Sequence, residues 1–136
     1  MIAPDSSVLI AALDADHEAH EPALSALAGR SPRLIAHVAF ETVSVFTRLP
    51  EGLRVAPATV LGALERDFKL PWLALDVAGQ RSCLTLACAA GIQGGALYDA
   101  LIAATAVKHG ATLISADRRA RDTYEAMGAS VSLLGA

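Results

Sequence analysis

The chain has few aromatic residues, few cysteines, little net charge and no long uninterrupted apolar run. Only 4% of its 136 residues are Phe, Trp or Tyr, although 54% are hydrophobic. Its core must therefore pack mainly through Ala, Val, Leu and Ile. This length suits one domain whose core needs neither a disulfide nor a structural metal. We expect a single domain over residues 1–136.

The small net charge excludes one general route to nucleic-acid binding. The formal charge is −3 at pH 7, with 11 basic residues against 14 acidic ones. A field of this sign does not attract a polyanion to the molecule as a whole. Any polyanionic partner must be held by local basic residues or through a bound cation.

The cysteines and the apolar segments exclude a secreted or membrane-spanning protein. Cys83 and Cys88 are five residues apart, which fits neither a zinc knuckle nor a redox pair, so we expect two buried free thiols. Asp5 interrupts the first apolar run and no basic segment precedes it, unlike a signal peptide. Three glycines break the longest uncharged stretch, residues 82–98, so it is too irregular to cross a bilayer. We predict a cytoplasmic protein that makes no contact with a membrane.

Short apolar segments alternate with helical patterns along the whole chain. Asp5 can cap a first helix, Pro57 is suited to the start of another, and Gly110 to the end of a third. We expect helices over residues 8–13, 17–28, 37–49, 57–69, 77–90, 97–109 and 117–127. We expect strands over residues 2–4, 33–36, 72–75, 111–115 and 130–133. This order predicts an α/β domain with a mainly parallel central sheet of short strands and helices on both faces.

Asp5 and Asp117 each follow a predicted strand and open a helix. A helix cap is the alternative role for both residues, and for Asp5 taken alone it is the better explanation. In parallel sheets, however, ligands bind beyond the carboxyl ends of the strands. We therefore expect both acids to lie in one cleft. Ser115 precedes Asp117 by two residues and offers a hydroxyl that can orient a carboxylate or a metal-bound water.

Glu41 and Asp99 lie within helical segments that offer no local cation. No Lys or Arg is three or four residues from Glu41, so a helix salt bridge does not explain it, and a solvated face is the alternative. The helical neighbours of Asp99 are the apolar Ile102, Ala103 and Ala106, beside which an unpaired charge is costly. The helix dipole favours an acid in the first turn but does not account for these apolar surroundings.

Acids that gather without cations repel one another and raise each other's pKa. A divalent cation removes this repulsion, and Mg²⁺ binds carboxylates, waters and substrate phosphate oxygens. It can also activate water and neutralise the charge that develops on a phosphate. The acids therefore predict metal-dependent cleavage of a phosphodiester bond. Arg118, Arg119 and Arg121 follow Asp117 and can contact phosphates, with a solvated helix face as the alternative for at least one of them.

Four segments, in order and at family-like spacing, resemble the PIN-domain nucleases and, within them, the VapC-type toxins of bacterial toxin–antitoxin modules. They are residues 4–10, 39–42 with 48–50, 98–104 and 113–119. The resemblance implies a three-layer α/β/α PIN domain and an endoribonuclease that uses Mg²⁺ or Mn²⁺ and stops translation by cleaving RNA. It also implies a homodimer and a cognate antitoxin whose C-terminal segment blocks the active site.

The resemblance also assigns roles to individual positions. It implies four acids that bind metal and carry the catalysis, with Glu41 acting directly or through a metal-bound water: Asp5, Glu41, Asp99 and Asp117. Ser6 and Ser115 would be supporting hydroxyls, and Ser6 stands where the family often has threonine. We predict RNA contacts from Arg118 and Arg119, and from Arg48 beside the loop at residues 50–57.

Other classes of protein fit the chain less well. A haloacid-dehalogenase-like phosphatase needs a second Asp where this chain has Ser7, and a receiver domain needs paired N-terminal acids and a late lysine. A third alternative is a non-catalytic protein whose acidic cleft grips a basic peptide or RNA. An antitoxin arm that carries arginine would be bound in this way whether or not RNA is cut.

Overall fold

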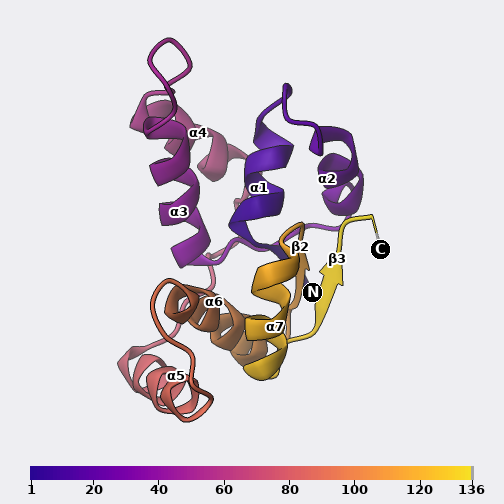
Figure 1. Ribbon diagram of the computed structural model, residues 1–136. Helices are drawn as coiled ribbons and strands as arrows, with labels where there is room; N and C mark the ends of the chain where they lie inside the picture. The colour runs from indigo at the N-terminus through magenta and orange to yellow at the C-terminus, as the bar shows by residue number, and fades with distance from the viewer. Residues whose placement is uncertain (136) are drawn as a thin grey trace.

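Three short strands lie between two groups of helices in the computed structural model, which describes residues 1–135 (Figure 1). Along the chain the elements are β1 (Ile2–Pro4), α1 (Ser6–Leu13), α2 (His20–Leu27), α3 (Ala36–Thr47), α4 (Pro57–Asp67), α5 (Val77–Ala89), α6 (Ala96–His109), β2 (Thr112–Ser115), α7 (Arg118–Ala126) and β3 (Val131–Leu133).

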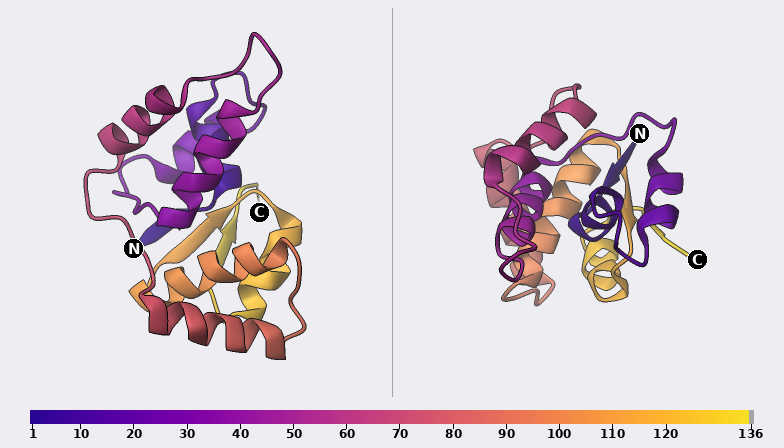
Figure 2. Two further views of the ribbon diagram at one scale, coloured as in Figure 1. Left: turned by 90° about the vertical axis from the view of Figure 1, so that its left-hand side faces the viewer. Right: turned by 90° about the horizontal axis from the view of Figure 1, so that it is seen from above.

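The described strands form one parallel sheet in the order β1-β2-β3. Ala3 pairs with Leu113, and Leu113 pairs in turn with Val131, so β2 is the central strand. Helices α1 to α4 lie on one side of this sheet and α5 to α7 on the other (Figure 2, left). Both Ala3 and Leu113 are fully buried, as parallel strands covered on both faces require. The predicted α/β architecture with helices on both faces is confirmed.

The helix boundaries follow the predicted signals to within a few residues. Asp5 accepts a hydrogen bond from the backbone N–H of Val8 and caps α1, and Pro57 occupies the first turn of α4. Gly110 ends α6 with a φ of 70°, a left-handed conformation that glycine adopts without steric cost. The start of α2 was predicted three residues too early, because the Nδ1 atom of His17 accepts from the backbone of Ala19 within a turn.

Two of the predicted strands are wrong. Residues 33–36 and 72–75 share a single isolated bridge between Ile35 and Leu73 instead of forming a ladder. Backbone hydrogen bonds join Leu73 to Leu34 over 2.8 Å and Ala36 to Leu73 over 2.9 Å. The segment cannot lengthen, because α3 begins at Ala36 on one side. Pro32, which has no N–H to donate, precedes it on the other.

The central helix α6 fits closely between its neighbours because its inner face carries small side chains. Ala100, Ala103 and Ala106 are fully buried there. One prediction about the cysteines is wrong: Cys83 is buried, but Cys88 is exposed because five residues along a helix turn it to another face. Among residues 1–135, no helix is long and apolar enough to cross a membrane.

Candidate active site

The carboxyl ends of β1 and β2 bring Asp5 and Asp117 to the same edge of the sheet. The two strands are parallel neighbours, and the backbone N–H of Asp5 donates to the carbonyl of Ile114 over 2.9 Å. The Ser7 hydroxyl accepts from the backbone N–H of Ala116 over 2.9 Å and ties the two strand ends together. The two acids therefore lie at one edge of the sheet, as the strand order predicts, and α1 and α7 both start from this edge.

Asp5 is buried, and each of its carboxylate oxygens accepts two hydrogen bonds. Oδ1 accepts from the Ser7 hydroxyl over 2.5 Å and from the Val8 N–H over 3.2 Å. Oδ2 accepts from the Ser115 hydroxyl over 2.5 Å and from the Tyr124 hydroxyl over 2.9 Å. With only 2% of its surface exposed, Asp5 does more than cap a helix. Hydroxyl and amide donors stabilise the buried anion in place of a cation.

Tyr124 contacts the candidate site, which the sequence did not predict. It lies 119 positions from Asp5 and is 2% exposed, yet its hydroxyl reaches the carboxylate. Burial, followed by the nearby charge of Asp5, raises the pKa of Tyr124, so its hydroxyl remains a donor. One signal could have found it: Ala120, Tyr124 and Met127 share one face of α7, and a buried tyrosine needs a partner for its hydroxyl.

Asp99 lies in the first turn of α6 and is half-buried. Burial raises its pKa to about 6, and repulsion from Glu41, Asp117 and Asp5 contributes in that order, against a smaller opposite effect of His37. Asp99 is therefore close enough to the other three predicted acids for their charges to act on it. A carboxyl group with this pKa releases its proton near neutral pH, which is unusual for an aspartate and common in functional sites.

Glu41 reaches the cluster from α3 with one oxygen that has no partner. Its Oε1 atom is buried and accepts no hydrogen bond. Burial raises the pKa of Glu41, the charge of Asp5 raises it further, and the nearby Ser6 hydroxyl partly offsets both effects. A buried acceptor without a donor is costly in an isolated domain. It is suited to a ligand that arrives later.

Asp117 is the most exposed of the four acids and caps α7. Its Oδ1 accepts from the N–H groups of Arg119 and Ala120 over 2.9 and 3.3 Å. Its own N–H donates to the Ser115 hydroxyl over 3.0 Å, so Ser115 links Asp117 to Asp5. The cap role that the sequence left open is therefore real, and it leaves Asp117 beside the cluster.

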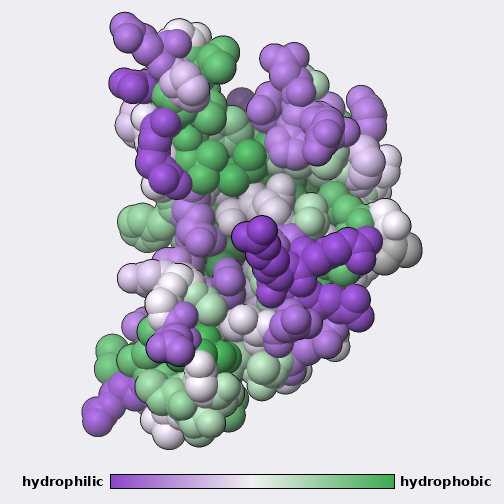
Figure 3. Space-filling model, viewed as in Figure 1, coloured by the Kyte–Doolittle hydropathy of each residue, from purple (hydrophilic) through white to green (hydrophobic). Residues whose placement is uncertain are grey.

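The cationic side chains near the site are peripheral to the acids. Within residues 1–135 the two salt bridges join Arg66 to Asp67 and Arg121 to Glu125, so none of the four acids has a cationic partner. Of the three arginines Arg118, Arg119 and Arg121, it is therefore Arg121 that forms a surface salt bridge. Arg118 and Arg119 are exposed at the start of α7, where strongly hydrophilic side chains gather (Figure 3).

A cleft of about 430 Å³ opens beside Glu41 between α1, α3 and α6. Arg48 lines it, and its Nε atom donates to the carbonyl of Ser44 over 3.2 Å. The other lining residues are Ser6, His37, Phe40, Glu41, Ser44, Val45 and Tyr98. Three predicted site residues, Ser6, Glu41 and Arg48, therefore face one opening, while Arg118 and Arg119 lie on α7.

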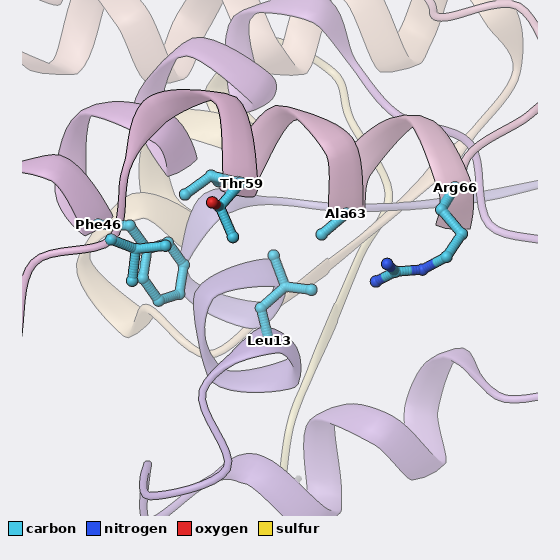
Figure 4. Close-up of a pocket in the computed structure, with 7 residues that line it drawn as sticks. Leu13, Phe46, Thr59, Ala63 and Arg66 are labelled. Atoms are coloured by element: carbon cyan, nitrogen blue, oxygen red, sulfur yellow. The ribbon is translucent and has the colours of Figure 1, made fainter.

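A second pocket of about 210 Å³ lies between α1, α3 and α4, away from the acids. Leu13 lies between Phe46 at one end and Arg66 at the other (Figure 4). None of the seven residues that line it carries a carboxylate. Its chemistry differs from that of the cluster, which remains the candidate active site.

The donor set of the cluster fits a hard divalent cation. Carboxylate and hydroxyl oxygens are the ligands that Mg²⁺ prefers. The charges of Glu41, Asp117 and Asp5 add to the effect of burial on the pKa of Asp99, and Glu41 Oε1 is buried without a partner. As the side chains stand, no group of three His, Cys, Asp or Glu residues within residues 1–135 is arranged to hold an ion. A bound ion would therefore require at least one carboxylate to move, and Glu41 Oε1 is a buried acid oxygen without a hydrogen-bond donor.

The fold and the acidic cleft define the class of protein. The PIN domain family matches residues 2–126, and the chain belongs to this family. Within it, the chain is similar to ribonucleases of the VapC type from Mycobacterium tuberculosis. It is 45% identical to Ribonuclease VapC40 over 134 residues, which cover 98% of this chain and 99% of the relative. Ribonuclease VapC27 is 41% identical over 130 residues, covering 96% and 94%. The predicted membership of the VapC-type PIN domains is confirmed.

Solved structures share the fold at lower sequence identity. FitAcB from Neisseria gonorrhoeae has a TM-score of 0.68 at 22% identity and covers 96% of both chains. FitAB bound to an IR36 DNA fragment has a TM-score of 0.72 at 21% identity, covering 98% of this chain and 94% of that one. At this level of identity the two likenesses support the three-layer fold alone.

Proposed function

We propose that this chain is a divalent-metal-dependent endoribonuclease and the toxin of a toxin–antitoxin pair. One observation carries the proposal: Asp99 has no cationic partner, and burial, followed by repulsion from Glu41, Asp117 and Asp5, raises its pKa to about 6. The names of the curated relatives, Ribonuclease VapC40 and Ribonuclease VapC27, support the same activity.

Asp5, Glu41, Asp99 and Asp117 would hold Mg²⁺ or Mn²⁺. When bound, such an ion supplies charge neutralisation for the phosphate and a lowered pKa for water. The chain itself holds the oxygens in place. Hydroxyl donors orient the Asp5 carboxylate, and the backbone of α7 orients Asp117. Glu41 Oε1, which lacks a donor, is available to accept a proton from the attacking water.

Hydrolysis needs the RNA backbone to lie across this acidic cleft. Arg118 and Arg119, which are exposed at the start of α7, and Arg48, which lines the cleft, would contact the phosphates. These arginines supply local positive charge, which a chain with an overall charge of −3 needs in order to hold RNA. Action on cellular RNA fits the cytoplasmic location that the sequence predicts.

The proposal includes an antitoxin and a second copy of the chain. The acidic cleft suits a basic side chain of an inhibitory segment, because a cation there would relieve the same repulsion that a metal relieves. The homodimer rests on the resemblance to VapC-type toxins. Light scattering of the isolated chain tests it directly.

The activity is tested by incubating the antitoxin-free protein with total cellular RNA, with Mg²⁺ or Mn²⁺ or with EDTA. Asp99→Asn is the inactive variant, and Glu65→Gln, which removes an exposed acid from α4, is the matched control. The proposal expects discrete fragments that need the metal, vanish with Asp99→Asn and persist with Glu65→Gln. Equal cleavage by wild type and Asp99→Asn would overturn it. Absence of cleavage together with retained binding to a basic antitoxin peptide would favour the non-catalytic alternative.

A further inference from the structure

Two exposed aromatic side chains line the acidic cleft. Phe40 is 76% exposed and Tyr98 is 57% exposed, in a chain that has few aromatic residues. Phe40 directly precedes Glu41 on α3, and Tyr98 directly precedes Asp99 on α6. Single exposed apolar residues are common on protein surfaces. Two rings in one cleft, each adjacent in sequence to a candidate catalytic acid, form a local feature of the site.

Tyr98 is already held in a stacked arrangement. Its ring lies parallel to that of His37, with an angle of 1° between the planes and 5.2 Å between the centroids. Its second ring face can extend this stack. A ring that is ordered before a ligand arrives loses little conformational freedom when it binds.

The charges around the rings suit a nucleotide better than a purely apolar ligand. Glu41 lines the cleft beside the two rings, and the cation Arg48 lines it as well. Nucleobases have flat faces that stack on aromatic rings, while their phosphates need positive charge. The cleft therefore offers a contact for each part of one nucleotide.

We propose that Phe40 and Tyr98 form a nucleobase-binding subsite that takes one unpaired base of the RNA next to the phosphate at the acids. The proposal rests on the proposed nuclease function and narrows its substrate class. A base inside a duplex is already stacked on its neighbours and cannot reach these rings. The substrate is therefore single-stranded or looped RNA, and Arg48 contacts an adjacent phosphate.

Binding is measured in the Asp99→Asn background, which prevents cleavage, with Mg²⁺ present. The probe is a mixed-sequence single-stranded RNA of about 12 nucleotides that carries 2-aminopurine, compared with the same strand in a duplex. Tyr98→Ala and Phe40→Ala should each weaken binding of the single strand about tenfold and reduce the quenching of 2-aminopurine. Tyr98→Phe keeps the ring face and should keep the affinity. Leu84→Ala on α5, an exposed apolar residue outside the cleft, is the control.

A second readout uses the active background. Stacking that is equal in the ground state and the transition state changes KM and leaves kcat unchanged. Tyr98→Ala should therefore raise KM about tenfold while kcat stays close to that of the wild type.

Each other outcome overturns the subsite. If Phe40→Ala and Tyr98→Ala bind single-stranded RNA as tightly as their parent, the rings take no base. If light scattering shows that these variants separate two copies of the chain while RNA affinity is unchanged, the rings are a contact between copies. In both cases a wild-type chain that still cleaves RNA leaves the proposed function standing. A wild-type chain that neither binds nor cleaves RNA overturns both proposals.

Discussion

Replacing Asp99 by asparagine should abolish RNA cleavage and at the same time stabilise the metal-free protein. In the folded chain, burial and the charges of Glu41, Asp117 and Asp5 raise the pKa of Asp99 from 3.8 to about 6. A raised pKa means that the folded state binds the proton more tightly than the unfolded state. The resulting stability is present below pH 3.8 and is lost as the pH rises through about 6. Above that pH, the ionised carboxylate opposes folding.

The size of this effect follows from the shift. About two pKa units correspond to an upper bound of about 3 kcal/mol. Because Asp99 is half-buried and solvent screens its interactions, we reduce this to about 1 kcal/mol. Asparagine has nearly the same shape without the charge. The melting temperature of Asp99→Asn in EDTA should therefore exceed that of the wild type by about 3 °C at pH 7.5, with no gain near pH 4.

The assay is thermal unfolding followed by circular dichroism at a series of pH values, in EDTA and then in excess Mg²⁺. A bound ligand stabilises only the state that binds it, so Mg²⁺ should raise the melting temperature of the wild type and leave that of Asp99→Asn nearly unchanged. Glu65→Gln controls for the loss of one negative charge elsewhere on the surface. A variant that is less stable than the wild type at pH 7.5 in EDTA would refute the reasoning, since it would mean that Asp99 stabilises the apo fold.

Three further predictions concern the surroundings of the acids. Tyr124→Phe removes one of the two donors to Asp5 Oδ2. It should lower the free energy of unfolding by about 1–2 kcal/mol in urea titrations and weaken Mn²⁺ binding. Unchanged Mn²⁺ affinity would limit Tyr124 to a packing role. Arg118→Ala should weaken binding to RNA of any sequence and reduce the salt dependence of binding by about one phosphate contact. Arg121→Ala should do neither, because the Arg121 side chain is already paired with Glu125. Equal effects of the two substitutions would exclude a special role for Arg118. Mg²⁺ affinity measured by calorimetry should fall as the pH drops below about 6, because protons compete for Asp99; an affinity independent of pH between 5 and 7 would contradict its role as a ligand.

The elements that a local pattern dictates could be predicted from the sequence. Asp5 and Asp117 each follow an apolar strand, and the parallel order places both strand ends at one edge. Asp99 was identified by its apolar helical neighbours Ala103 and Ala106, both of which are fully buried. These inferences depend on spacings of a few residues, and over this range the periodicity of a sequence indicates which residues share a face.

Contacts between distant parts of the chain could not be predicted. The Tyr124 hydroxyl meets Asp5 only after α7 has packed against the sheet, and the two residues are 119 positions apart. The segments at 33–36 and 72–75 have the apolar composition of strands, but the residues that flank them limit their pairing to one bridge. The exposure of Phe40 likewise depends on which face of α3 the rest of the fold covers.

The central claim is that the four acids form one divalent-metal site. The most direct measurement is an anomalous difference map from crystals of the wild-type chain soaked in Mn²⁺, alongside crystals of Asp99→Asn. We expect density among Asp5, Glu41, Asp99 and Asp117 that disappears in the variant. Density that persists in the variant, or that lies only at sites distant from these carboxylates, would contradict it.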